Sequence, residues 1–165
     1  MKKMLLCFVL ALTLAGCGEA EVFETVGDEM VQSVMAEPRE ISLALPEEAV
    51  LPAMETDNGT IYICQHYDVS VQTLESGDLE KTIRSVSGFD MYDLTIMETT
   101  VSDADCYEFV WTSAGEWEDQ VCRCRILDDG NYHYVLTVMA DADTAPRLEE
   151  GWQSIFSSFS LRIET

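Results

Sequence analysis

The chain has 165 residues, of which 47% are hydrophobic, and its 31 acidic and 9 basic residues give a formal net charge of −22 at pH 7. This length and this apolar content are enough for one domain with a core of normal size. The strong negative charge argues against nucleic-acid binding and against membrane attachment through basic residues, because it repels phosphate backbones and anionic lipid headgroups.

The first sixteen residues have the parts of an export signal in their usual order. Two lysines are followed by an apolar run over residues 4–13, and small residues then lead to Cys17. The apolar run is too short to span a bilayer, which takes about 20 residues. Residues 14–17 read Leu-Ala-Gly-Cys and resemble the lipobox of bacterial lipoproteins, which implies cleavage before Cys17 and lipidation of that cysteine. The alternative is an ordinary secretory signal with a chance cysteine.

The resemblance to the lipobox implies a division of the chain into three parts. Residues 1–16 would be the signal peptide, residues 17–40 a lipidated acidic tether, and residues 41–165 a single domain. One acyl chain binds a membrane only marginally, whereas two give stable anchoring, and a lipobox cysteine acquires at least two. We therefore expect the protein on the outer face of the cell membrane, where the acylated Cys17 anchors it in the lipid bilayer. This location would also allow a protein partner at the cell envelope.

The first part of the domain predicts short strands. Residues 41–45 alternate and stop at Pro46, which is typical of an edge strand or of the strand that leads into a domain. Residues 47–58 predict a loop that ends in an Asn-Gly turn. Two β-rich runs, residues 60–64 and 67–74, flank a short polar segment and predict a hairpin.

A short amphipathic helix follows the hairpin. Its apolar residues share one face: Leu79, Ile83 and Val86. Asp78 can cap its start, and Gly88 can end it in a left-handed conformation. Residues 94–101 are rich in threonine and predict a strand, and residues 102–105 predict a turn whose side chains bond their own backbone.

Residues 106–139 predict three antiparallel strands joined by tight turns. A two-residue turn of type II′ at Gly115-Glu116 would place Glu108 opposite Arg123. It would also pair apolar residues with cysteines on the other face: Tyr107 with Cys124, and Phe109 with Cys122. A second turn at residues 128–130, with Gly130 in the left-handed conformation, would set the same cysteines opposite Tyr134 and Leu136. Both registers therefore place the two cysteines in the core.

The last helix has the strongest helical period in the chain. Its apolar residues are Leu148, Trp152, Ile155, Phe156 and Phe159. Pro146 lies in the first turn, behind Asp143 or Thr144 as the cap. We expect Gly151 to permit a close approach, and residues 160–163 predict a short return strand. The inward residues of the preceding strand should pack under this helix: Tyr134, Leu136 and Val138.

These elements predict an α+β domain in which an antiparallel meander packs against a short helix and a long C-terminal helix. The order of elements, with the strand Tyr132-x-Tyr134-x-Leu136 before the helix of Trp152 and Phe159, resembles the PsbP-like fold over residues 41–163. The chain is also similar to uncharacterised small lipoproteins of Gram-positive anaerobes. The resemblance implies binding or assembly at membranes more often than catalysis, and it carries no site residues over.

Four cysteines remain after Cys7 and Cys17 are assigned to the signal and the lipid: Cys64, Cys106, Cys122 and Cys124. Neither Cys122-x-Cys124 nor Cys64-x-His66 has the spacing of structural zinc or of a thioredoxin-like pair. Free cysteine behaves as a small hydrophobic residue, so we expect buried thiols. The expected register puts Cys106 on the face opposite the other meander cysteines, so any disulfide should involve Cys64.

No catalytic residue, metal site or cofactor is predicted. His66 in a turn and His133 at a strand start are expected to be surface or packed residues. The Asp-Ala-Asp segments at residues 103–105 and 141–143 could offer oxygens to calcium, but both lack the glycine and the distal glutamate of a calcium loop.

The favoured function is therefore a binding or accessory module. The alternatives are a hydrolase or redox enzyme with a dispersed site, or a carrier of a small ligand or cation. A pocket that joins His66, a cysteine and a carboxylate by hydrogen bonds would favour the enzyme, and a groove without titratable groups would favour a binder.

Overall fold

A computed structural model describes residues 36–49, 52–114 and 119–162, all within one compact unit, Met35–Thr165. The expected signal peptide, the lipidation site Cys17 and most of the tether lie outside the described residues. Within them, no helix is both long enough and apolar enough to cross a bilayer.

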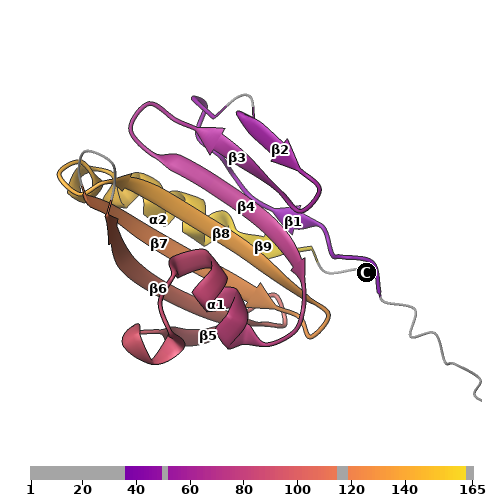
Figure 1. Cartoon of the computed structure of the whole chain (residues 1–165). Coiled ribbons are helices and arrows are strands. Elements are labelled where there is room, and N and C mark those ends of the chain that lie inside the picture. Colours follow the sequence, from indigo (N-terminus) through magenta and orange to yellow (C-terminus); the bar gives the residue numbers. More distant parts are fainter. Residues whose placement is uncertain (1–35, 50–51, 115–118, 163–165) are drawn as a thin grey trace, which may run out of the picture. The chain divides into compact units, whose positions relative to one another are not determined.

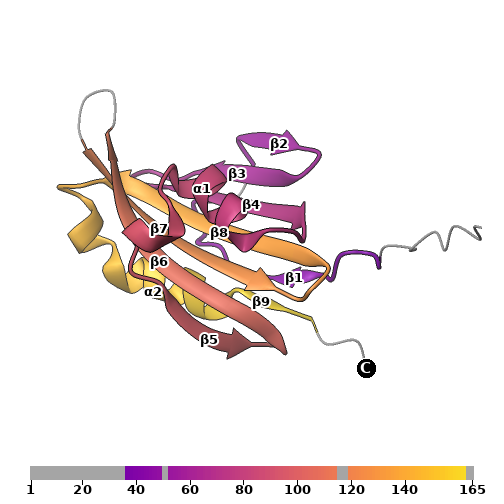
Figure 2. The same cartoon turned by 60° about the horizontal axis from the view of Figure 1, so that its bottom comes forward.

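The domain is α+β and is built on an antiparallel sheet with the strand order β2-β3-β4-β8-β7-β6-β5 (Figure 1). The strands are β2 Met54–Thr56, β3 Gly59–Ile63, β4 Asp68–Glu75, β5 Met97–Val101, β6 Ala104–Ala114, β7 Asp119–Asp128 and β8 Tyr132–Asp141. A short helix, α1 Leu79–Ser87, and the terminal helix, α2 Glu149–Ser158, lie on opposite faces of this sheet (Figure 2). Two further short strands, Ile41–Ser42 (β1) and Ser160–Leu161 (β9), pair with each other.

The expected hairpin and short helix are confirmed. β3 and β4 flank the polar segment, and the Cys64 N–H donates to the Tyr67 carbonyl over 2.9 Å. The Asp78 side chain accepts from the Glu80 N–H at the start of α1, and Gly88 ends the helix with φ +80°. Both ends of α1 are therefore fixed by the residues that the sequence indicates.

Three expected boundaries in the first half are wrong. The expected loop over residues 47–58 contains β2, which pairs with β3 across the Asn58 turn. The strand expected from residue 94 begins at Met97, after a short 3-10 helix, Met91–Asp93 (η1). The following turn has two residues, because Ser102 and Asp103 have φ +52° and +62° and Ala104 already belongs to β6. This geometry matches the right-handed twist of a hairpin.

The expected register of β6 and β7 is wrong by two residues. The expected turn, Gly115-Glu116, lies outside the described residues, but Ala114 pairs with Asp119, so four residues separate the strands. Glu108 therefore lies opposite Arg125, and Phe109 opposite Cys124. A shift of two preserves the face of each side chain, so Phe109 and the cysteines still share a face.

The expected register of β7 and β8 is wrong by three residues, which changes the faces. Gly130 is left-handed, as expected, with φ +87°. However, the Asp129 N–H bonds to the Tyr132 carbonyl, so the turn centres between Gly130 and Asn131 instead of on Asp129, and Leu127 lies opposite Tyr134. Cys124 pairs with Thr137 instead of Tyr134. An odd shift places Tyr134 and Leu136 on the face opposite the two cysteines.

The sheet consequently has two cores, one on each face. The α2 core contains Cys106, Leu127, Tyr134, Leu136, Val138, Trp152, Ile155, Phe156 and Phe159. The α1 core contains Ile83, Phe109, Trp111, Cys122, Cys124, Ile126 and Val135. The expected packing of α2 on the inward residues of β8 is confirmed. Cys106 lies on the face opposite Cys122 and Cys124, also as expected.

The start of α2 differs from the prediction. Pro146 belongs to a separate 3-10 helix, Ala145–Arg147 (η2), and Thr144 precedes it without a capping side-chain bond. Gly151 is exposed, and a Cβ placed there would meet nothing within 4 Å, so the expected close approach is wrong. The return strand is confirmed as the two-residue β9.

An ion-pair cluster lies beneath α2. Glu108 accepts from Arg123 at 3.0 Å, the expected partner, and also from Arg125, its neighbour in register. Arg125 donates to the Phe156 carbonyl, and the Arg123 guanidinium lies 4.5 Å from the centre of the Phe156 ring. These contacts satisfy a nearly buried carboxylate and join the sheet to α2.

Candidate binding site

Helix α1 covers only part of its face of the sheet. Its buried Ile83 packs in one cluster with Val135, Ile126 and Phe109 of the sheet. Other residues on this face of four adjacent strands are not covered by the helix, and together with it they border a cavity of about 330 Å³. We call this cavity the sheet groove, and it is lined by Ser70, Gln72, Ser85, Val86, Ser87, Trp111, Ser113, Cys122, Thr137 and Met139.

The strand registers explain which residues form the groove. Side chains alternate between the two faces of a strand, so residues 68, 70 and 72 of β4 point to the α1 face. Ser70 lies opposite Thr137, and Cys122 lies between Met139 on one side and Trp111 on the other. Four adjacent strands therefore supply a regular, preformed wall.

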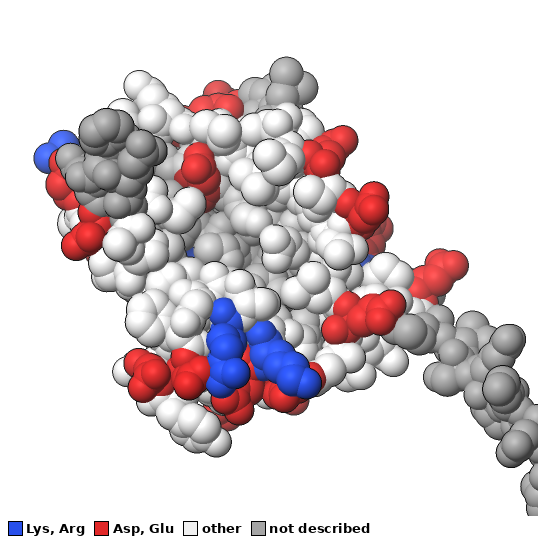
Figure 3. Space-filling model, viewed as in Figure 1, with Lys and Arg blue, Asp and Glu red and all other residues white. Residues whose placement is uncertain are grey.

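All ten lining residues are uncharged at neutral pH, in a chain with 31 acidic residues. Figure 3 shows a hollow of uncharged atoms on this face, with acidic residues around it and basic residues over α1. The groove therefore differs in charge from the surface that surrounds it.

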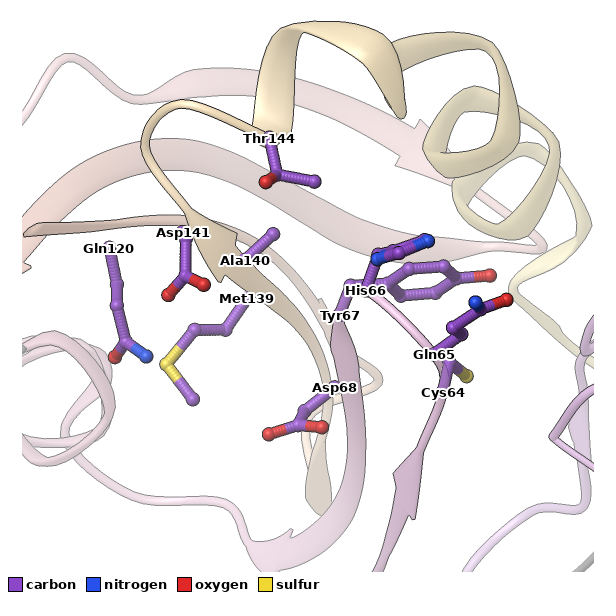
Figure 4. A pocket seen from close by; sticks show the side chains of 10 residues that line it. All are labelled: Cys64, Gln65, His66, Tyr67, Asp68, Gln120, Met139, Ala140, Asp141 and Thr144. Carbon is purple, nitrogen blue, oxygen red and sulfur yellow. The ribbon is translucent and has the colours of Figure 1, made fainter. Parts of the chain in front are cut away.

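The groove adjoins a second cavity of about 230 Å³, and Met139 lines both. Asp68, Gln120 and Asp141 line this second cavity on the same face of the sheet, and we call them the carboxylate end. Figure 4 shows these three side chains and Met139 on one side of the strands, away from His66 and Tyr67.

The surroundings of Asp68 disfavour its ionisation. Burial raises the pKa of Asp68 above its ordinary value, and the negative charge of Asp141 raises it further. In the described part of the chain, no basic side chain forms an ion pair with either residue. The site therefore holds unbalanced negative charge next to an uncharged groove.

Cys64 and His66 line the second cavity, yet they do not form a catalytic pair. Among the described residues, no hydrogen bond joins His66 to a cysteine or to a carboxylate. Burial raises the pKa of the Cys64 thiol, although the thiol bonds to Tyr67, and a nucleophilic cysteine needs the opposite shift. Cys64 and Tyr67 belong to the α2 core, whereas Asp68 points to the α1 face.

The two thiols of β7 are buried, as expected from the sequence, and that of Cys122 lines the groove. Cys122 is 2% exposed and Cys124 is fully buried. Burial raises the pKa of both thiols, and that of Cys124 reaches about 12. Thiols in this state are poor nucleophiles and act as small apolar groups.

Trp111 gives the groove an aromatic wall with a free donor. Its ring centre lies 5.5 Å from that of Phe109, and only 8% of the residue is exposed. The indole N–H of Trp111 bonds to no described residue. It is also not fully buried, since among the described residues only the Trp152 side-chain nitrogen is both fully buried and without a hydrogen-bond partner. Trp111 lines the groove, and its indole N–H is therefore available to a hydrogen-bond acceptor.

His133 fixes the helical wall of the groove. It is fully buried, and its Nδ1 lies 2.8 Å from the Thr82 hydroxyl of α1. Its Nε2 lies 3.3 Å from Asp128 and 3.5 Å from the Ser76 hydroxyl. These bonds tie α1 to β7 and β8, so His133 is a packed residue, one of the two outcomes that the sequence predicts.

The two Asp-Ala-Asp segments have separate local roles. Asp103 lies in the tight turn before β6, and Asp143 accepts from the Thr144 hydroxyl over 2.9 Å. Within the described residues, no group of three or more His, Cys, Asp or Glu side chains could hold a metal ion.

The groove could not be predicted from the sequence. Its signal is the polar face of β4, where Asp68, Ser70 and Gln72 alternate with Val69 and Val71. Such a pattern predicts a half-exposed strand, but it does not reveal that α1 and three other strands enclose that face.

No family model matches the sequence, and no curated protein matches it. Solved structures share its fold. Protein PA94 of unknown function from Pseudomonas aeruginosa matches with a TM-score of 0.51 and 12% identity, over 75% of this chain and 99% of that one. The Ran-binding protein Mog1p of Saccharomyces cerevisiae matches with a TM-score of 0.52 and 12% identity, over 73% and 89%. A Bacteroides thetaiotaomicron protein matches with a TM-score of 0.52 and 8% identity, over 75% of this chain and 46% of its own.

Proposed function

We propose that this chain is a lipid-anchored binding module on the outer face of the cell membrane, acylated at Cys17, and that its ligand site is the sheet groove. The lipobox-like residues 14–17 support the anchor. We assign the domain to the PsbP-like fold on the basis of its antiparallel meander and C-terminal helix, and the likeness to Mog1p supports this assignment.

The single observation that carries the binding function is the composition of the groove. An enzyme of hydrolase or redox type needs a nucleophile, base or cofactor site aimed at its cavity. This groove instead presents hydroxyls, one amide and an indole on a rigid sheet, and its only thiol has a raised pKa. Such a lining can orient a ligand, but it contains no base that could activate one of its hydroxyls as a nucleophile.

The fold likeness agrees with a binding role without naming a ligand. Mog1p is a Ran-binding protein, but at 12% identity only the fold is comparable. We therefore take no partner from it.

Native mass spectrometry of the full chain, extracted in mild detergent from its own membrane, tests the proposal. We expect a bound mass on the wild-type protein that is lost in Ser70→Trp, which fills the groove. Thr100→Trp, on the exposed edge strand β5, should retain it. Equal retention in both variants, or a wild-type protein that carries no ligand, would contradict the function.

A further inference from the structure

The carboxylate end lacks a positive partner. Asp68 on β4 is paired in register with Met139, and Asp141 lies two residues further along β8. Both side chains line the same cavity and form no ion pair with a described residue. Asp68 is half-buried and Asp141 is exposed. The half-buried Asp68 carboxylate has the negative charge of Asp141 near it and no counter-charge, and a cation placed between the two would remove their repulsion.

The chemistry of this end suits an ammonium group better than a metal ion. Calcium takes six to eight oxygen ligands, and magnesium requires near-ideal octahedral geometry. The carboxylate end supplies two carboxylates and the Gln120 amide, and the described residues contain no larger metal-binding group. An ammonium group needs only acceptors for its N–H bonds, which these three side chains provide.

The adjoining groove requires a different chemistry. The side chains of Ser70 and Gln72 form no hydrogen bond with other described residues, and the Trp111 indole N–H is also free. An apolar ligand would desolvate these groups and leave them unpaired, which is unfavourable. A hydroxylated ligand can bond to them, and the apolar face of a sugar-like ring can pack on the indole.

The register also sets the size of the ligand. Asp141 on β8 and Trp111 on β6 are separated by β7 alone. Neighbouring strands lie about 4.8 Å apart, which gives about 10 Å across the sheet. Trp111 also lies two residues along β6 from Ser113, which shares the register row of Asp141, so the two positions are about 12 Å apart. A molecule that reaches both has approximately the length of a disaccharide.

We infer that the sheet groove binds a hydroxylated organic cation of disaccharide size, with its ammonium group between Asp68 and Asp141 and its uncharged body against Trp111. This inference rests on the proposed function and adds the chemical class of the ligand.

Tryptophan indole resonances provide a test in the full chain. The chain has three tryptophans, so ¹⁵N-tryptophan labelling of the detergent-solubilised protein gives three indole signals, which Trp→Phe variants assign. Trp111 reports on the groove, and Trp152 on the opposite face is the internal control. The probes are singly deacetylated chitobiose, which carries one ammonium group, and diacetylchitobiose, which is neutral.

We expect the cationic sugar to shift the Trp111 signal without moving that of Trp152, and to bind about fivefold more tightly than the neutral sugar. Asp68→Asn combined with Asp141→Asn should remove this preference. Asp93→Asn combined with Glu98→Gln removes the same charge outside the groove and should keep it.

Equal affinity of the two sugars for the wild-type protein would overturn the inference about the cation and leave the groove as a binding site. If neither sugar shifts Trp111, the hydroxylated class is wrong. Neither result depends on the mass-spectrometric test of the proposed function, which retains whatever ligand the membrane supplies.

Discussion

At the residue scale, Asp68 of the carboxylate end lowers the stability of the folded domain. Its pKa is raised above 3.8 by burial and by Asp141, so the folded state prefers the neutral carboxyl. A group of this kind contributes stability below its unfolded pKa and loses that contribution as the pH rises through its folded pKa. At neutral pH the ionised Asp68 therefore destabilises the domain, as is common for residues kept for binding.

We predict that Asp68→Asn stabilises the protein at pH 7 by about 0.5–1 kcal/mol. The gain should disappear below about pH 4, where the wild-type carboxyl is protonated. Urea denaturation over this pH range measures it, with the exposed Glu98→Gln on β5 as the control. A loss of stability at pH 7 would show that the two carboxylates do not repel each other.

His133 is the second residue whose role can be measured. Thr82→Val keeps the shape of the side chain but removes the hydroxyl 2.8 Å from the buried Nδ1. An unpaired buried polar group costs about 1–3 kcal/mol, so we expect a destabilisation of that size. Thr100→Val, at an exposed position of β5, should change the free energy of unfolding by less than about 0.5 kcal/mol. Equal effects would mean that His133 does not hold α1.

At the element scale, helix α2 is part of the core. Trp152 is 5% exposed and packs with Phe156 and β8 in the α2 core. This arrangement leaves its apolar face unavailable to a partner, although the same spacing could also serve a docking helix.

We predict that Trp152→Ala lowers the free energy of unfolding by about 3–5 kcal/mol, the range for a buried large aromatic residue. Chemical denaturation of a form that begins at Gly18 measures the change. Ser154→Ala, at an exposed position of the same helix, is the matched control. An unchanged midpoint for Trp152→Ala would mean that the helix is exposed.

Some elements of the fold could be predicted from the sequence, and others could not. Helix α1 could be predicted because Asp78 and Gly88 fix its ends locally. The register of β7 and β8 could not, since the run of turn-forming residues before Tyr132 offers more than one centre for the turn. The groove was missed for a related reason. Local alternation gives the polar face of β4, but the tertiary packing of α1 decides whether that face is open.

At the scale of the whole molecule, the proposed binding module has two functional parts, the sheet groove and a lipid anchor at Cys17. Cys17 lies outside the described residues, so its lipidation is tested chemically. We predict that metabolic labelling with a fatty-acid probe tags the wild-type protein and not Cys17→Ala, and that the variant leaves the membrane fraction. Cys7→Ala is the control, because that cysteine would leave with the signal peptide. Labelling of Cys17→Ala at the wild-type level would exclude the anchor.

The proposed ligand site lies on the α1 face of the sheet. Site-specific photocrosslinking in living cells tests it most directly, with p-benzoylphenylalanine at one of two exposed helical serines. Ser85 lies on α1 at the rim of the groove, and Ser154 lies on α2 on the opposite face. We predict that irradiation adds the mass of a bound molecule to the protein labelled at Ser85 and leaves the protein labelled at Ser154 unchanged. Adducts at Ser154 alone, or at neither position, would contradict the assignment of this groove as the binding site.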